Sequence, residues 1–370
     1  MNLVRWSLTR AVALVGLALV LTAAAANQSW LDRHFLPSFF VPRHWYVWIE
    51  SAVRLLIGAA GVGLTLGRHR AARLLTDAPV LTLQLIAAAV LAVVAGEFVL
   101  RTVNIGATEW LRPEEEPQRK PDAELGWVLA PARTGHSRVG GRPIEYAIDE
   151  AGYRVAQADQ PVDSERTTLV CAGESVMFGE GLRWDETIPA RAGAMLGIQS
   201  ANLAVHGYST DQIYLRLARE LPRFRRPVAV VAIFMTELFG RNLDNDRPHL
   251  GPGLTPLPAE GRSRVMSLAS LLVPYRRDAT VERGVEVTRE VLRAMVQLAR
   301  KHGATPLVVM PQFGVEADAQ RTLRERIVTP DVPAVLVPLD PDWRLPGDRH
   351  PNARAATVIA AAIAARLHGN

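Results

Sequence analysis

The sequence contains a single cysteine, Cys171, in 370 residues. One thiol excludes an intramolecular disulfide and a zinc site built from cysteines, and we expect Cys171 to pack as a small buried apolar side chain. The sequence also lacks a glycine loop for phosphate and a dinucleotide-binding fingerprint. We therefore expect no cofactor.

Basic residues do not form runs interleaved with aromatic residues, although the formal net charge is +5. This scatter argues against a nucleic-acid interface. Asp244, Asp246 and His249 gather in a polar stretch, which we interpret as a loop rather than a metal site, and we predict no bound metal.

Apolar residues make up 49% of the chain, and the excess lies near the N-terminus in three stretches, residues 11–26, 47–66 and 78–100. The second and third are long enough to cross a hydrocarbon core, which needs about 20 residues. The first also fits a cleavable signal peptide, because a basic start and a short apolar centre lead to Ala23–Ala26. We favour an uncleaved helix, since the apolar residues begin at Leu3.

Positive residues flank the spans unevenly. The N-terminus and the short loop between spans two and three carry five arginines, Arg5, Arg10, Arg68, Arg70 and Arg73, whereas the longer stretch 27–46 carries Arg33 and Arg43. The positive-inside rule then places the N-terminus in the cytoplasm. We predict a multi-pass protein of the inner membrane, in contact with the lipid bilayer, whose residues after Leu100 lie in the periplasm or its equivalent.

Composition divides the chain into three parts: a membrane domain at 1–110, a linker and entry segment at 111–160, and a third domain at 161–370. Residues 111–122 are charged and rich in proline, as expected of an exposed linker. Residues 123–160 contain several aromatic residues and glycines. We expect them to form a β-rich cover at the edge of the third domain.

After Thr167 the chain alternates short β-branched runs with amphipathic helical patterns. The expected strands are Leu169–Cys171, Ala201–Val205, Val228–Met235, Pro306–Met310 and Ala334–Leu339. The expected helices are Asp185–Leu196, Thr210–Leu221, Val281–His302, Ala317–Ile327 and an alanine-rich one after Asn352. This alternation predicts an α/β domain with a parallel sheet covered by helices on both faces.

Polar residues follow several of these strands. Ser175, Gly207 and Thr236 come just after strand ends, and Asp348 and His350 follow the last strand. Because sites in such sheets gather at the carboxyl ends of the strands, we expect these residues to meet. Ser175, on a turn into a helix, would be a nucleophile once His350 takes its proton and Asp348 orients the imidazole. The backbone N–H groups of Ser175 and Gly207, with a side chain near Thr236, would stabilise an oxyanion.

Three motifs in this order resemble blocks of the SGNH (GDSL-like) hydrolases, here of a membrane-anchored type: Gly173-Glu-Ser175, Asn202-Leu-Ala-Val-His-Gly207 and Asp348-Arg-His-Pro-Asn352. The resemblance covers about residues 122–366. It implies a three-layer α/β/α flavodoxin-like fold and ester hydrolysis or acyl transfer. By matching position it implies Ser175 as nucleophile, His350 as base with Asp348 as its partner, and Gly207 as an oxyanion donor.

The third block departs from this pattern. The family has an Asn whose amide is a third oxyanion donor, whereas this chain has Thr236 followed by Glu237, with Asn242 as an alternative donor. Losing one oxyanion donor costs about 10²–10³ in rate, and losing the nucleophile costs roughly 10⁶. The departure therefore predicts a slower or more selective enzyme before it predicts an inactive one.

Three functions are consistent with these patterns. The first is a serine esterase acting outside the cytoplasm on O-acyl or O-acetyl groups of envelope glycans, or on a small ester. The second is an O-acetyltransferase to a polysaccharide, for which a membrane partner supplies the acyl donor. The third is a weakly active or inactive envelope module that binds glycan.

Overall fold

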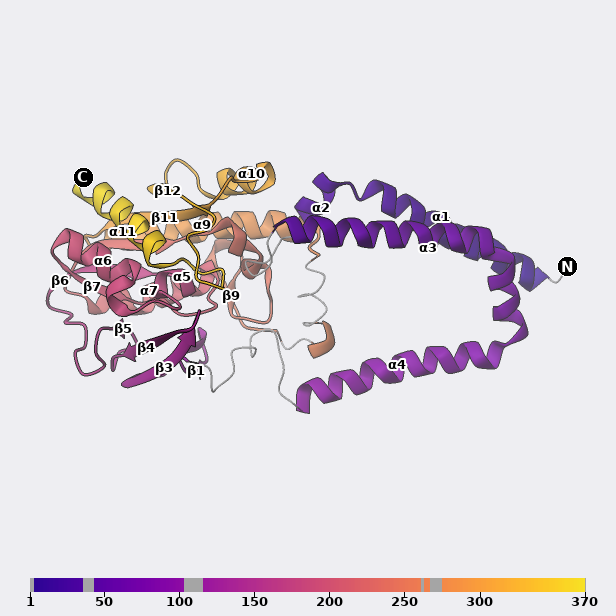
Figure 1. Cartoon of the computed structure of the whole chain (residues 1–370), viewed down its shortest axis with the longest axis horizontal. Helices are drawn as coiled ribbons and strands as arrows, with labels where there is room; N and C mark the ends of the chain where they lie inside the picture. Colours follow the sequence, from indigo (N-terminus) through magenta and orange to yellow (C-terminus); the bar gives the residue numbers. More distant parts are fainter. Residues whose placement is uncertain (1–2, 36–42, 103–115, 261–262, 267–274, 370) are drawn as a thin grey trace. The chain divides into compact units, whose positions relative to one another are not determined.

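The computed structural model describes residues 3–35, 43–102, 116–260, 263–266 and 275–369 (Figure 1). It divides into two compact units, residues 1–107 with 262–276, and residues 108–261 with 277–370. Residues 111–115 of the predicted linker lie outside the described residues. The predicted limits at residues 110 and 160 stay predictions.

The first unit is helical. It contains α1 (Leu3–Ala25), α2 (Gln28–His34), α3 (Arg43–Asp77) and α4 (Pro79–Thr102). Three of these, α1, α3 and α4, are long and apolar enough to cross a membrane, as the three apolar stretches predicted.

The expected loop between the second and third spans is wrong. Arg68, Arg70 and Arg73 lie within α3, because residues 70–75 consist of arginine, alanine and leucine, which favour helix. The helix ends only at Asp77, since a proline at position 79 disfavours helical backbone at the residue before it.

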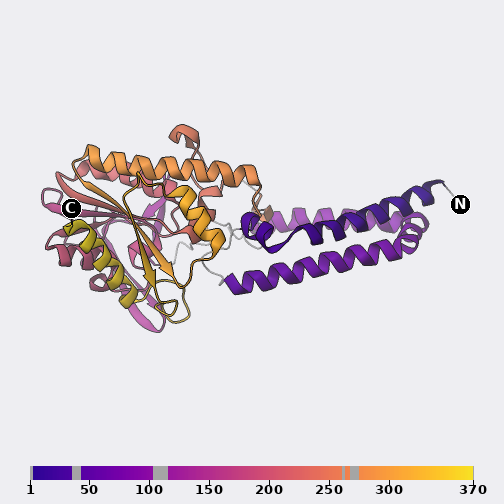
Figure 2. The same cartoon turned by 90° about the horizontal axis from the view of Figure 1, so that it is seen from above.

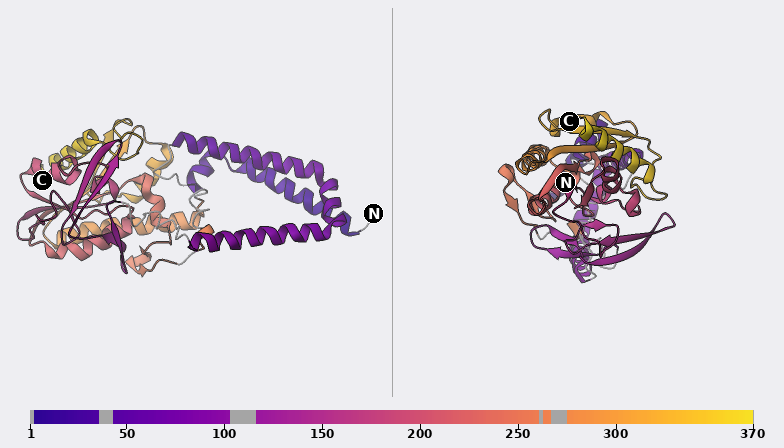
Figure 3. Two further views of the ribbon diagram at one scale, coloured as in Figure 1. Left: turned by 60° about the horizontal axis from the view of Figure 1, so that its bottom comes forward. Right: turned by 90° about the vertical axis from the view of Figure 1, so that its left-hand side faces the viewer.

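Helices α1 and α3 pack side by side (Figure 3). Their contact depends on two glycines. A Cβ at Gly16 would lie 2.7 Å from Gly61 O, and a Cβ at Gly61 would lie 2.6 Å from Gly16 O. Side chains at these positions would push the helices apart, because small residues allow close approach of helix backbones in membranes.

The second unit is built on an eight-stranded sheet with the order β12-β11-β8-β6-β7-β5-β4-β3. Its strands are β3 (Arg133–Val139), β4 (Arg142–Ile148), β5 (Arg154–Val155), β6 (Thr167–Ala172), β7 (Gln199–Asn202), β8 (Arg226–Ile233), β11 (Thr305–Phe313) and β12 (Ala334–Leu339). The neighbouring pairs from β12 to β7 are parallel. Numbered along the chain, these five strands have the flavodoxin-like order 2-1-3-4-5.

The sheet is mixed rather than wholly parallel. Strands β5, β4 and β3, from the entry segment, extend it antiparallel beyond β7. Gly140 and Gly141 both have positive φ, which is the two-residue turn that a hairpin prefers. The entry segment is thus β-rich as expected, and it joins the sheet. Two short pairs lie outside this sheet, β1 (Arg119–Asp122) with β2 (Gly126–Leu129), and β9 (His249–Leu250) with β10 (Pro256–Leu257).

Helices cover both faces of the sheet, giving three layers. On one face α6 (Ile188–Leu196) packs against α11 (Ala353–His368), and on the other α7 (Thr210–Glu220) packs against α9 (Asp278–Lys301). Figure 2 shows α9 and α11 on opposite sides of the sheet. Helix α10 (Asp318–Ile327) packs on α9. The remaining helical turns are α5 (Ser175–Phe178), η1 (Trp184–Glu186), η2 (Leu221–Arg223), η3 (Thr236–Leu243) and η4 (Pro252–Leu254).

The expected helix 185–196 is divided at Thr187 into η1 and α6. Thr187 is the N-cap of α6, with a proline in the first turn, so the helix begins there. Two further caps fix the starts of helices that follow site loops. Ser209 and Gln212 form a capping box at α7, and Asn352 Oδ1 accepts hydrogen bonds from two backbone N–H groups at the start of α11.

Candidate active site

Ser175 is the first residue of the one-turn helix α5, three residues after the end of β6. The turn needs glycine at two points. A Cβ at Gly173 would lie 2.3 Å from Met177 Cβ, and Gly179 ends the helix with a φ of 87°. Ser175 is only 5% exposed. The local sequence therefore holds the hydroxyl rigidly at the carboxyl end of a buried strand.

His350 lies against this hydroxyl although 175 positions separate the two residues. His350 Nε2 is 2.8 Å from Ser175 Oγ, and Nδ1 is 2.6 Å from Asp348 Oδ1. The backbone N–H of His350 also donates to Asp348 Oδ1, at 2.8 Å. The structure thus brings together the three residues that the sequence singled out for acyl chemistry.

The loop that carries Asp348 and His350 is closed by backbone hydrogen bonds. Leu345 N donates to His350 O at 2.9 Å, and Asn352 N donates to Trp343 O at 3.0 Å. These bonds place the imidazole between the end of β12 and the start of α11. Its orientation is consequently set by the backbone as well as by the carboxylate.

The charges around His350 and Asp348 favour an imidazole that accepts a proton. Burial would lower the pKa of His350, but the hydrogen bond and charge of Asp348, with Glu180 and Glu174 adding to them, raise it above its usual value. Burial would raise the pKa of Asp348, but its bonds to His350 hold that pKa below the usual value. Asp348 therefore stays ionised and holds the imidazole with Nε2 towards Ser175.

Gly207 follows β7 and has a φ of 76°, which a side chain would strain. The loop that contains it is tied to the Ser175 turn, since Val205 N donates to Gly173 O at 3.1 Å. Arg247 donates to Gly207 O at 2.5 Å. Gly207 therefore lies at the same edge of the sheet as Ser175.

The two residues considered for a third oxyanion donor differ in their surroundings. Thr236 begins η3, directly beyond β8, and is half-buried. Asn242 Nδ2 donates to Thr210 Oγ1 at 3.0 Å and to Thr288 Oγ1 at 2.9 Å. Because an amide has two donor hydrogens, Asn242 is engaged in joining η3 to α7 and α9 instead of serving Ser175.

Glu174 is a neighbour of the hydroxyl that sequence reasoning missed. Its Oε2 accepts hydrogen bonds from Ser175 Oγ at 2.7 Å and from Val176 N at 3.0 Å. Ser175 Oγ thus has two acceptors within reach, a carboxylate and an imidazole. The signal was present in Gly173-Glu-Ser175, where a carboxylate directly precedes the serine.

A second carboxyl–imidazole pair lies beside the first. Glu180 Oε2 contacts His206 Nδ1, and Tyr146 Oη donates to Glu180 Oε1 at 3.3 Å. Burial raises the pKa of Glu180 to about 7, and burial, followed by the charge of Arg119, holds the pKa of His206 well below its usual value. His206, paired with Glu180 and packed against Phe178, therefore supports the loop before Gly207.

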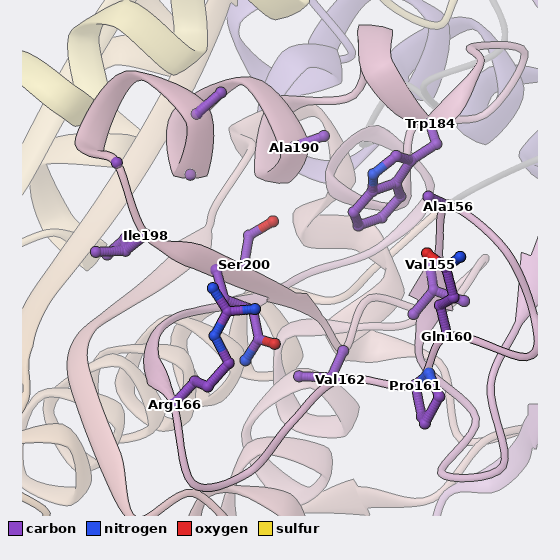
Figure 4. Close-up of a pocket in the computed structure, with 14 residues that line it drawn as sticks. Val155, Ala156, Gln160, Pro161, Val162, Arg166, Trp184, Ala190, Ile198 and Ser200 are labelled. Carbon is purple, nitrogen blue, oxygen red and sulfur yellow. The ribbon is translucent and has the colours of Figure 1, made fainter.

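A cavity of about 550 Å³ lies near the amino ends of β6 and β7 (Figure 4). Arg166, just before β6, and Gln199, at the start of β7, line it with Trp184. Ser175 follows the opposite end of β6, so this cavity is separate from the site. Among the described residues, no group of three His, Cys, Asp or Glu side chains is arranged to hold a metal ion.

No family model matches the chain, and no curated protein matches it. Solved structures that match include a protein of the G-D-S-L lipolytic family from Desulfitobacterium hafniense DCB-2, at 15% identity, 54% of this chain, 99% of that chain and a TM-score of 0.36. An acetyl xylan esterase from Butyrivibrio proteoclasticus matches at 14% identity over 57% and 65%, with a TM-score of 0.33. A G-D-S-L lipolytic protein from Veillonella parvula DSM 2008 matches at 11% identity over 53% and 94%, with a TM-score of 0.32.

The descriptions of these neighbours agree with the resemblance that the motifs indicated. The identities and TM-scores are low, and the chemistry of this chain is inferred from the geometry around Ser175 instead.

Proposed function

We propose that the chain is a membrane-anchored serine esterase that removes O-acyl groups, such as acetyl, from envelope glycans outside the cytoplasm. The observation that carries the proposal is the continuous contact from Ser175 Oγ through His350 to Asp348. A serine hydroxyl becomes a useful nucleophile when a base takes its proton and a carboxylate orients that base. All three groups are present at hydrogen-bond distance.

In the proposed reaction Ser175 Oγ bonds to the ester carbonyl carbon while its proton passes to His350 Nε2. Asp348 stabilises the imidazolium that results. The tetrahedral intermediate then loses the glycan alkoxide, which takes the proton from Nε2, and leaves an acyl group on Ser175. Attack by water, with His350 again as base, releases the acid and restores the hydroxyl.

The test uses the full chain in detergent with a fluorophosphonate, which forms a covalent bond to activated serines. We expect labelling at Ser175 in the wild-type chain, found by mass spectrometry, and none in Ser175→Ala. His350→Ala should reduce labelling by several orders of magnitude, because the base is lost. Unchanged hydrolysis of a chromogenic acetyl ester by Ser175→Ala would refute the proposal.

The location is part of the same proposal. Three apolar helices support membrane association, and the excess of arginine near the start of α1 and near the end of α3 supports a cytoplasmic N-terminus. The chain would then lie in the inner membrane with its second unit in the periplasm. Alkaline phosphatase fused after the C-terminus should be active in cells, whereas a fluorescent C-terminal fusion that folds only in the cytoplasm would contradict this topology.

A transferase is the second candidate, and the low exposure of the site favours it. Ser175 and His350 are 5% and 7% exposed, which limits access of bulk water to an acyl-enzyme. A polysaccharide hydroxyl would then accept the acyl group, and a membrane partner would supply the donor. Trapping the acyl-enzyme and offering water alone or water with glycan separates the two, because only a transferase releases acyl-glycan faster than acid.

The third candidate, a glycan-binding module without catalysis, is favoured by Thr236 at the position of the family's Asn. It predicts that the folded wild-type chain resists the fluorophosphonate. Labelling at Ser175 would exclude it.

A further inference from the structure

The oxyanion site expected around Ser175 has two backbone donors, the N–H groups of Ser175 and Gly207, and lacks the side-chain amide that would be the third. Thr236 carries a short hydroxyl side chain at that position, and the amide of Asn242 is bonded to Thr210 and Thr288. A site that stabilises negative charge needs donors aimed at where the charge develops. The question is which group of this chain lies there.

Arg241, also on η3, contacts a neighbour in the chain of each backbone donor. Its Nη1 lies 4.0 Å from Glu174 Oε2 and 3.5 Å from Tyr208 O. Glu174 precedes Ser175 in the chain, and Tyr208 follows Gly207. The guanidinium is therefore beside the residues whose N–H groups would bind the oxyanion.

Distances place this guanidinium near the reacting atoms. Glu174 Oε2 is 2.7 Å from Ser175 Oγ, so Arg241 Nη1 lies at most about 6.7 Å from Oγ. An oxyanion donor acts from about 3 Å. Arg241 would come within this distance by a rotation of its long side chain towards Ser175.

The guanidinium of Arg241 also has more N–H donors than polar contacts. It carries five N–H donors, and within the described part of the chain its two polar contacts are the long ones to Tyr208 and Glu174. The side chain is 16% exposed. Burial lowers the pKa of Arg241 to about 10, so the group is positively charged at neutral pH. A buried cation with long contacts is costly unless an anion completes its surroundings.

We propose that Arg241 is the third oxyanion donor of the Ser175 site, taking the place of the absent amide. The inference rests on the proposed function. As the Oγ–C bond forms, the carbonyl π pair moves to oxygen, and Arg241 shares the negative charge with the N–H groups of Ser175 and Gly207. The proton goes to His350 Nε2, and charge returns to the carbonyl when the glycan alkoxide leaves.

The experiment uses the full chain in detergent, a neutral substrate, 4-nitrophenyl acetate, and a neutral fluorophosphonate. Arg241→Met should lower kcat by about 10²–10³ with KM changed less than threefold, because the contact forms in the transition state. Phosphonylation of Ser175 should slow to a similar degree. Arg241→Lys keeps the positive charge but loses the planar set of guanidinium donors, and it should retain at least tenfold more activity than Arg241→Met.

The matched control is Arg289→Met. Arg289 is a half-buried arginine on α9 whose guanidinium donates to Arg326 O at 2.6 and 3.0 Å. It should leave kcat and labelling unchanged. A second variant separates a donor role from a structural one: Thr236→Asn added to Arg241→Met supplies an amide and should recover at least tenfold in kcat.

Three results would overturn the proposal. The first is a kcat for Arg241→Met within threefold of wild type while Ser175→Ala is inactive. The second is a loss in Arg241→Met that is confined to KM for 4-nitrophenyl acetate. The third is a loss of kcat in Arg241→Met that Thr236→Asn leaves unchanged. The first leaves the esterase proposal intact and removes only Arg241 from it. A wild-type chain that the probe does not label would remove both.

Discussion

Replacing Glu174 by Gln removes a negative charge next to the Ser175–His350 contact while keeping an oxygen that accepts a hydrogen bond. Oε2 of Glu174 is 2.7 Å from Oγ, and Oγ is 2.8 Å from His350 Nε2. The carboxylate oxygen and Nε2 are therefore at most about 5.5 Å apart. At this distance the carboxylate stabilises the imidazolium directly.

The magnitude follows from Coulomb's law. Two unit charges about 5.5 Å apart interact by about 3 kcal/mol at an effective dielectric constant of about 20, and by half as much at about 40. This interaction favours the imidazolium, so the charge of Glu174 contributes to the raised pKa of His350.

The proposed mechanism determines the direction in which the pH profile moves. Ester cleavage needs neutral Nε2, so activity rises as the pH rises through the pKa of His350. Removing the charge of Glu174 lowers that pKa. The acid limb of the kcat/KM profile for Glu174→Gln should then move to lower pH.

The assay is hydrolysis of 4-nitrophenyl acetate by the full chain between pH 4.5 and 8.5, corrected for the rate without enzyme. The control is Glu220→Gln, which removes a buried carboxylate that accepts a hydrogen bond from Tyr153 Oη at 2.7 Å and takes no part in the site. Glu180 remains in both variants, so its own titration is common to them. If the acid limb of Glu174→Gln coincides with that of the wild-type chain, the electrostatic reasoning is refuted.

Three stability predictions concern glycines and a buried arginine. Gly179→Ala places a Cβ 2.5 Å from Thr187 Cγ2 at a φ of 87°, whereas the Cβ of Gly197→Ala meets no atom within 4 Å at a φ of 67°. Gly179→Ala should therefore lose about 1–3 kcal/mol more free energy of unfolding in urea than Gly197→Ala. Equal losses would contradict a role for crowding. Arg154→Met removes the buried hydrogen bonds that the guanidinium donates to the carbonyls of Phe178, Gly179 and Leu182. It should cost about 3–5 kcal/mol by the same measurement, and a cost below about 1 kcal/mol would show that these bonds contribute little. Gly16→Leu should lower the unfolding temperature of the full chain in detergent by several degrees, because the leucine forces α1 away from α3. The control is Gly63→Leu, which should not lower it, since a Cβ at Gly63 meets no atom within 4 Å. Equal unfolding temperatures for the two variants would exclude the close contact.

Much of the site was predictable because it follows from local pattern. A β-branched run that ends at Gly173 marks a strand followed by a tight turn, and parallel strands place their carboxyl ends at one edge. Ser175 and His350 could be paired on that basis alone. The same reasoning predicted three layers and five parallel strands, and the structure has both.

The partners that surround the hydroxyl could not be predicted in this way. Whether Glu174 turns to Ser175, or Asn242 to α7 and α9, depends on rotamers that are settled only when the surrounding elements pack. The position of Arg241 depends on how η3 folds back over the loop at Gly207. Spacing along the chain carries no information on any of these choices.

By itself the sequence determined which segments are apolar enough to enter a membrane, which form strands and helices, and which polar residues end up at one edge of the sheet. These properties depend on side-chain periodicity within a few turns or strand lengths. Only the tertiary structure decided that the entry segment extends the sheet, that α3 continues through its arginines, and that Arg241 lies beside Glu174, the neighbour of Ser175. Those outcomes are set by contacts between residues far apart in the chain, where packing and hydrogen-bond satisfaction override local preference.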